Sequence, residues 1–190
     1  MEAEHRLIEN VVKALGRAGV AVGQGRPVDA SMLTAAGEFL RLYADKLHHG
    51  KEETFFFPAL VKRGVPANGC PIEGLNHEHD RGRALVQALA EHTSAYERGQ
   101  PAAPEALQQT LRGLLDLYQS HIWKEDAMVF PMANRILTAE DQQELSAQFA
   151  VVDRAVGLDT IARLEGFARG LGSTALAPRP SKPGACRCRA

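Results

Sequence analysis

Two copies of a His-x-x-x-Glu pattern hold the residues whose types and spacing best suit metal chemistry. Residues 48–58 read HHGKEETFFFP and residues 121–131 read HIWKEDAMVFP, so the two stretches align without a gap. An imidazole and a carboxylate four residues apart lie on one face of a helix. Two such pairs in the same register predict two halves of one metal site. The pairs are His48 with Glu52 and His121 with Glu125.

The repeat extends beyond these two stretches. The sequence EHRLIENVVKAL begins at Glu4 and EHDRGRALVQAL begins at Glu78, so each has a Glu-His pair near its start. Nearly equal lengths of chain separate His5 from His48 and His79 from His121. The sequence therefore predicts a helical hairpin that is used twice up to about residue 135, with pseudo-twofold symmetry.

Hydrophobic periodicity defines the elements that must position these residues. Apolar side chains recur at helical spacing, and no window alternates with period two for long enough to require a strand. The fold class is therefore all-α, an up-down-up-down four-helix bundle with one or two further helices at the C-terminal end. We expect helices at residues 2–22, 29–61, 71–97, 104–137, 138–155 and 158–171, and Thr138 with Asp141 resembles a capping box at the start of the fifth. Pro58 and Pro131 should kink or end the helices that contain them, and the inner stripe of the fourth helix includes Met128.

Three regions follow from this pattern. Residues 1–137 form the bundle, residues 138–171 form a helical extension, and residues 172–190 form a tail rich in Pro, Gly and Cys. The composition of the tail predicts disorder. Cys186 and Cys188 lie in this tail, and two cysteines alone do not complete a metal site.

In such a bundle, the start of the first helix and the end of the second lie at the same end. His5 and His48 are each roughly 28 Å from the turn between their helices, at a rise of 1.5 Å per residue. The same calculation places His79 and His121 at nearly the same depth. All four imidazoles therefore fall in one layer, and Glu52 and Glu125 lie one turn further on.

Four imidazoles and two carboxylates would be costly to bury unpaired in an apolar bundle. Core histidines that are each satisfied by a neighbouring Glu are one solution, and a bound cation is the other. Nitrogen and oxygen donors without sulfur suit iron, manganese or zinc, and two carboxylates able to bridge favour a pair of ions. We assign His5 and His48 to one ion, His79 and His121 to the other, and Glu52 and Glu125 as bridges.

The six residues resemble the hemerythrin-like family, often called HHE cation-binding domains. They match its pattern H…HxxxE…H…HxxxE over about residues 1–137. The resemblance implies a four-helix bundle that holds two non-haem iron ions, commonly with an oxo or hydroxo bridge. It also implies dioxygen, peroxide or nitric oxide as the small ligand, and it favours iron over manganese or zinc.

Two departures from the oxygen-carrying members bear on function. Those carriers have a further histidine one turn before the ligand of the third helix, where this chain has Leu75. Their last carboxylate is an Asp five residues after its His, where this chain has Glu125 at four. Reversible oxygen transport is thereby disfavoured, and an open or water-filled metal position favours sensing or redox chemistry.

Several neighbours of the six residues could join the site. His49 and His77 point about 100° and 200° away from it at 100° per residue, so we expect them on the surface or beside the ligands. Glu9 and Tyr118 each lie one turn from a predicted ligand, and whether either reaches the metals stays open. Glu53 and Asp126 are expected to be outward charges.

Two function classes remain. The first is a module that binds or senses dioxygen or a related oxidant. The second is a di-iron enzyme of the peroxidase, oxidase or nitric oxide reductase type, or a protein of iron handling or iron-sulfur repair. Ferritin-like storage is disfavoured because its Glu-x-x-His spacing occurs only from Glu2 to His5. No catalytic side chain beyond the metal ligands and no organic cofactor is assigned.

Composition excludes other classes of function. The 190 residues carry a formal net charge of −1 without a basic stripe, which argues against nucleic acid as a partner. The first residues are acidic and no apolar run approaches a membrane span, so we expect a cytoplasmic protein that does not enter membranes. The three cysteines do not make a disulfide framework. A homodimer stays open.

Overall fold

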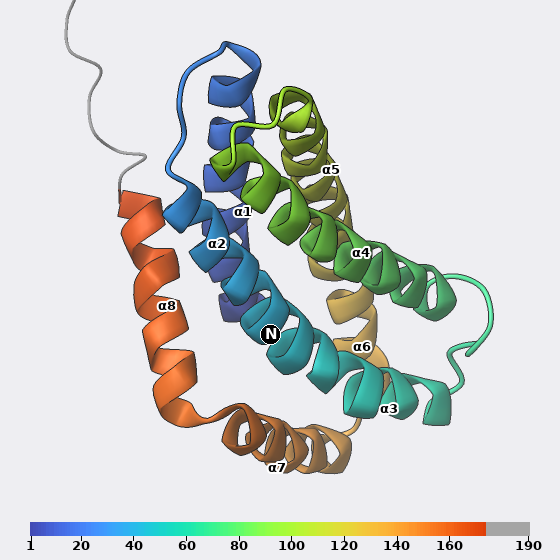
Figure 1. Cartoon of the computed structure of the whole chain (residues 1–190). Coiled ribbons are helices and arrows are strands. Elements are labelled where there is room, and N and C mark those ends of the chain that lie inside the picture. The colour runs from blue at the N-terminus through green and yellow to red at the C-terminus, as the bar shows by residue number, and fades with distance from the viewer. Residues whose placement is uncertain (174–190) are drawn as a thin grey trace, which may run out of the picture.

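The computed structural model describes residues 1–173, and all regular secondary structure in this part of the chain is helical (Figure 1). The predicted all-α class is confirmed for these residues. Most of the expected tail, including Cys186 and Cys188, lies outside the described residues. Residues 172 and 173 instead complete the last helix.

The first hairpin pairs a straight helix with a rod built from four segments. Helix α1 spans Glu2–Gly23. The Asp29 side chain accepts a hydrogen bond from the Ser31 amide at 2.9 Å and so caps the start of the second rod. Along that rod the segments are α2 (Ala30–Phe39), η1 (Leu40–His49), η2 (Glu52–Phe56) and α3 (Phe57–Lys62), where η denotes a π-helix.

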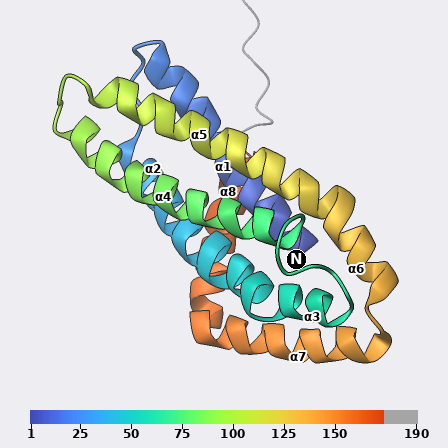
Figure 2. The same ribbon diagram turned by 90° about the vertical axis from the view of Figure 1, so that its right-hand side faces the viewer.

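The second hairpin has the same plan. Helix α4 spans Ile72–Glu97, and the rod that follows consists of α5 (Ala103–Lys124), η3 (Glu125–Val129) and α6 (Phe130–Ile136). Figure 2 shows α4 and α5 running side by side, with the rod that begins with α2 and ends with α3 below them. Helix α5 also packs against α1, and α4 against α2 and η1, so each rod has neighbours from both hairpins.

Neither proline ends its rod, contrary to one of the two outcomes expected from the sequence. Pro58 and Pro131 lie in the first turns of α3 and α6, directly after η2 and η3. A proline cannot donate a backbone hydrogen bond, and the rod continues as π-helical turns before each proline without a break. These wider turns also change which side chains face inward: Met128, expected on the inner stripe, is 55% exposed.

Helices α7 (Ala139–Val156) and α8 (Leu158–Ser173) pack against the two hairpins. The predicted capping box at the start of α7 is confirmed, with Thr138 and Asp141 each accepting from the other's amide. Helix α7 lies across η1 and η2, and α8 lies along α1 (Figure 1). Within residues 1–173, no helix combines the length and the apolar character needed to cross a membrane.

The buried apolar side chains form two clusters. The larger is centred on α1, α2, η1 and α5 and includes Leu164 and Ala168 of α8. The smaller surrounds Phe56, Leu60 and Phe130 near α3, α6 and α7. The layer of predicted metal ligands lies between the two clusters. His5 stacks on Phe130 of the smaller cluster at 5.3 Å between ring centroids. Ile8, one turn after His5, belongs to the larger cluster.

Candidate metal centre

The structure brings all six predicted ligands together in the interior. Each of two buried groups offers one donor atom per residue, and within a group these atoms lie within 4.8 Å of one another. Glu52 belongs to both groups. The first consists of His5, His48, Glu52 and Glu125, and the second of His49, Glu52, His79 and His121.

Glu52 lies between the two groups. Its Oε1 is 3.5 Å from Nε2 of His48, and its Oε2 is 3.5 Å from Nε2 of His79. The two oxygens of one carboxylate therefore face imidazoles from different hairpins. This is the placement that a carboxylate needs to bridge two ions.

Glu125 has the corresponding place on the other side. Its Oε2 is 3.1 Å from Nε2 of His5 and 3.4 Å from Nε2 of His121. Nε2 of His5 also lies 2.8 Å from Nε2 of His48. Four Nε2 atoms, one from each rod, thus point toward two carboxylates at the centre.

Burial shifts the protonation of these groups. Burial, and next the charge of Glu125, raises the pKa of Glu52 well above its usual range. Burial is also the main reason why the pKa of His48 falls to about 4. The imidazole is therefore neutral near pH 7, which is the form that binds metal ions.

The donor atoms fit a metal ion because several of them have no other partner. Both carboxylate oxygens of Glu52, and the Nε2 atoms of His79 and His121, form no hydrogen bond within the described part of the chain. A buried polar atom without a partner costs about 1–3 kcal/mol. A cation that accepts electron pairs from imidazole nitrogens and carboxylate oxygens would remove this cost at every one of these atoms.

A carboxylate holds the outer nitrogen of each of the four imidazoles. The Nδ1 atom of His48 is 2.7 Å from Oε2 of Glu4, and that of His121 is 3.1 Å from Oε2 of Glu78. These two carboxylates come from the Glu-His pairs that open α1 and α4. The repeated Glu-His pair therefore supplies one imidazole to the centre and a carboxylate to the imidazole of the next rod.

Glu53 and Asp126 correct an expectation from the sequence, since they do not act simply as outward charges. Oε1 of Glu53 is 2.6 Å from Nδ1 of His79, and Oδ1 of Asp126 is 2.7 Å from Nδ1 of His5. A carboxylate on Nδ1 fixes the ring orientation and directs the lone pair of Nε2 inward. The four rings are therefore preorganised before any ion binds.

Basic side chains hold these outer carboxylates in turn. Lys51 lies 2.6 Å from Glu4, and Lys124 pairs with Glu78. The two lysines have the same position in the repeated motifs, and each forms an ion pair with a glutamate. Burial opposes the ionisation of Glu4, but the hydrogen bond from His48 and the nearby positive charges outweigh it and lower its pKa to about 2. Glu4 is therefore ionised throughout the physiological range.

His49 is the site residue that the sequence reasoning missed. Its side chain is 3% exposed, its ring stacks on that of His79 at 3.8 Å between centroids, and neither ring nitrogen has a hydrogen-bond partner within residues 1–173. An offset of about 100° still places the ring of His49 in the interior, because α4 packs against η1 on that side and its His79 covers the ring.

A signal for His49 was present in the repeat. The residue aligned with it in the second copy is Ile122, and Ile122 is also buried. An apolar residue at that register marked an interior position in both hairpins.

Other residues considered from the sequence lie apart from the donor groups. Glu9 pairs with Arg6 and Lys13 on the surface of α1. The side chain of His77 is 75% exposed. Tyr118 is buried and its ring lies 6.3 Å from that of His49, but it is not a member of either group.

Comparison with known proteins agrees with this donor set. The family description "Hemerythrin HHE cation binding domain" matches residues 1–133. The chain belongs to the hemerythrin family. Its members bind metal cations, so the buried His and Glu groups of this hemerythrin-like chain occupy the place where a cation-binding site is expected.

Curated relatives of this hemerythrin-like chain include uncharacterized proteins of Mycobacterium bovis and Mycobacterium tuberculosis. Each is 27% identical over 121 residues, which cover 63% of this chain and 46% of the relative. The chain thus aligns with about half the length of these relatives. No solved structure gives a significant match.

Proposed function

We propose that this protein is a hemerythrin-like di-iron protein that binds or senses dioxygen or a related small oxidant. The observation that carries the proposal is the position of Glu52 and Glu125, which lie between imidazoles from different hairpins. A single ion would need only one of the two donor groups. Two donor groups that share a carboxylate suit a pair of ions.

The assignment of ligands follows the two groups. One ion is held by His5 and His48, the other by His79 and His121, and Glu52 and Glu125 bridge them. His49 adds a third imidazole to the second ion, because it lies with His79 and His121 in one donor group. The resulting centre is unequal, with more nitrogen donors on one ion than on the other.

Iron is the proposed metal because the donor set is nitrogen and oxygen without sulfur and the family is hemerythrin-like. When bound, a pair of iron ions supplies redox chemistry toward dioxygen, peroxide or nitric oxide. The chain itself keeps the imidazoles neutral and oriented through the outer carboxylates. Phe57, whose ring lies 6.0 Å from that of His79, and Phe130, next to His5, exclude water from that end of the centre.

The surrounding organisation is part of the proposal. Residues 1–137 would form the up-down-up-down bundle of the family, residues 138–171 an extension packed on it, and the protein would work in the cytoplasm. Reversible oxygen carriage is not proposed, because Leu75 stands where the carriers have a histidine and is 2% exposed among apolar neighbours.

The alternative is a di-iron redox enzyme of the peroxidase, oxidase or nitric oxide reductase type. It is favoured by a cavity of about 630 Å³ that reaches His49, since a site for diatomic molecules alone needs far less space. Iron handling or iron-sulfur repair belongs to the same class, because it too would act on a partner molecule.

Elemental analysis and stopped-flow spectroscopy test the proposal together. Protein purified from iron-replete cells should contain two iron ions per chain, and a content well below one would contradict the di-iron assignment. The reduced protein is then mixed with oxygen or with peroxide. A stable optical change that reverses when oxygen is removed supports a binder or sensor, whereas continuous turnover of peroxide supports the enzyme.

A further inference from the structure

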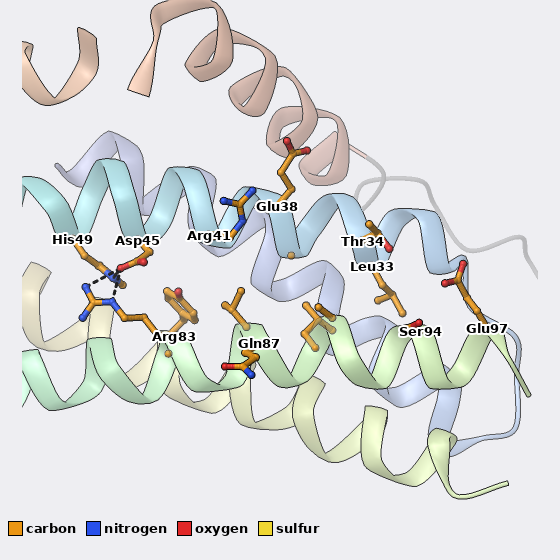
Figure 3. Close-up of a pocket in the computed structure, with 16 residues that line it drawn as sticks. Leu33, Thr34, Glu38, Arg41, Asp45, His49, Arg83, Gln87, Ser94 and Glu97 are labelled. Carbon is orange, nitrogen blue, oxygen red and sulfur yellow. Dashed lines mark hydrogen bonds and ion pairs between the residues drawn. The ribbon is translucent and has the colours of Figure 1, made fainter. Parts of the chain in front are cut away.

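A cavity of about 630 Å³ runs along the interface between the second rod and α4 (Figure 3). Leu33 of α2 and Glu97 of α4 lie at its outer end. Its inner end is formed by His49, Gly82 and Tyr118, next to the candidate metal centre. A volume of this size is in the range of about 300–1,000 Å³ that sites for small organic ligands have.

Comparison of the two interfaces related by the pseudo-twofold axis shows that the space is larger at one of them. The symmetry pairs the α2–α4 interface with the α5–α1 interface. There the helices approach closely: a Cβ on Gly16 would lie 2.8 Å from Leu115, and one on Gly23 would overlap Gln108. At the α2–α4 interface, a Cβ on Gly37 would meet nothing closer than Leu89 at 3.7 Å. The α1–α5 interface therefore leaves a smaller cavity, of about 410 Å³, than the α2–α4 interface.

Three of the five charged groups that line the cavity form ion pairs. Arg83 lies 2.8 Å from Asp45 and 2.7 Å from Glu53, and the close-up shows the first of these pairs at the inner end (Figure 3). Glu38 pairs with Arg163 of α8, which leaves it directed away from the cavity. The other two, Arg41 and Glu97, have opposite charges, and most of the other lining side chains are apolar. An occupant without net charge therefore complements this surface best.

The inner end carries a polar group without a partner. Nδ1 of His49 is 3.6 Å from Oδ1 of Asp45, beyond hydrogen-bonding distance, and Nε2 has no partner among the described residues. An imidazole buried to this degree is costly to leave unsatisfied. If Nε2 binds the metal, as in the proposed function, Nδ1 still faces the Asp45 side of the cavity. A hydroxyl or amine group on an occupant would satisfy it.

We propose that this cavity binds a neutral, elongated and largely apolar organic molecule, with one hydrogen-bonding end group placed at His49. The molecule lies between α2 and α4 and covers their apolar side chains. Its polar end is beside the metal centre, although its binding does not depend on the presence of the ions. The site thus adds an organic ligand to a protein whose proposed reactant is a small oxidant.

A fluorescence titration tests this inference on the full chain, both as purified and after removal of metal. The probe is N-phenyl-1-naphthylamine, a neutral, elongated molecule with one N–H group, whose emission rises in apolar surroundings. We expect saturable binding of one probe per chain in both forms. 1-Decanol should displace the probe, and decanoate should do so at concentrations about tenfold higher, because a carboxylate at the inner end would be buried beside the carboxylate of Asp45.

Two variants fill the cavity from opposite walls. Gly37→Leu acts from α2 and Ala90→Leu from α4, and both residues line the cavity. Each should weaken probe binding by about tenfold or more, because the added isobutyl group takes the place of buried probe surface. Gly166→Leu on α8 is the matched control, since a Cβ there meets nothing within 4 Å, and its probe affinity should equal that of the unchanged chain. Circular dichroism establishes that each variant is folded.

Three results would overturn the inference. These are the absence of saturable binding, unchanged affinity in a folded Gly37→Leu or Ala90→Leu variant, and displacement by decanoate at lower concentrations than by 1-decanol. Iron content separates this test from that of the proposed function. Probe binding by protein that contains no iron as purified from iron-replete cells would refute only the di-iron proposal, whereas iron-replete protein without probe binding would refute only the cavity.

Discussion

The imidazole of His49 stacks on that of His79, with ring centroids 3.8 Å apart and planes 8° apart. His79 belongs to the repeated pattern, whereas His49 is aligned with Ile122 in the second hairpin. The contact therefore has no histidine counterpart in the other half of the duplication, and the interior of the bundle is not symmetric. One donor group has two imidazoles and the other has three.

Replacement of His49 by the residue at the symmetric position tests this asymmetry. His49→Ile should keep the bundle folded, because isoleucine occupies the equivalent interior position, but it removes one donor from the second ion. We expect the affinity for one of the two ions to fall by about tenfold or more, as for the loss of other groups at a metal site. Titration with Fe(II) under anaerobic conditions measures both affinities. His77→Ile, on an exposed side chain, is the control, and identical titrations of the two variants would refute the role of His49.

The two central carboxylates should be needed by both ions. Glu52→Gln preserves the shape of the side chain but removes the charge that a bridging ligand supplies. The variant should therefore contain well under one iron per chain by elemental analysis. Glu73→Gln, at a half-exposed side chain near the start of α4, should retain the full content. Retention of both ions by Glu52→Gln would rule out a bridge at this position.

The outer carboxylates should act equally in the two hairpins. Glu4→Gln frees Nδ1 of His48, and Glu78→Gln frees Nδ1 of His121. Each change should lower the affinity for iron by about 10- to 100-fold, because a partner on the outer nitrogen orients the ring and raises its basicity. Competition with a chelator of known affinity measures the loss. A large effect of one variant and none of the other would show that the pseudo-twofold relation does not extend to these groups.

Acid should destabilise the metal-free protein through its buried imidazoles. The pKa of His48 is lowered by burial to about 4 from 6.5 in a free side chain, and that of His49 is lowered as well. Between these values the unfolded chain binds protons that the folded chain does not, so stability falls as the pH decreases from about 6.5 to about 4. Thermal unfolding of metal-stripped protein across this window measures the effect. The His49→Ile variant should show a smaller decrease, and a flat profile for the unchanged protein would contradict the argument.

The capping box of α7 should contribute to stability without affecting the metal centre. Thr138→Ala removes the side-chain acceptor for the Asp141 amide and should cost about 1 kcal/mol in the free energy of unfolding. Urea denaturation measures this loss. Iron content should be unchanged, because Thr138 lies in the turn between α6 and α7 and contacts none of the donor groups. Thr34→Ala, at an exposed position of α2, controls for the loss of a surface hydroxyl.

Much of the fold could be predicted because its information is local. Apolar periodicity and turn residues gave α1 and α4 to within a residue or two of their ends, and Thr138 with Asp141 marked the start of α7. Pro58 and Pro131 were harder to interpret. Sequence rules state what a proline removes from an α-helix, but they do not say that a π-helical turn can absorb the loss.

The sequence by itself determined the duplicated register, and with it a layer in which His5, His48, His79 and His121 meet two glutamates. It could do so because spacing along a regular helix fixes both depth and direction. Only the tertiary structure decided that His49 turns inward, that Glu53 and Asp126 hold imidazoles, and that the larger cavity lies at the α2–α4 interface. These features depend on which faces of neighbouring helices pack together and on the distance between them, and neither is encoded in the spacing of residues along a single helix.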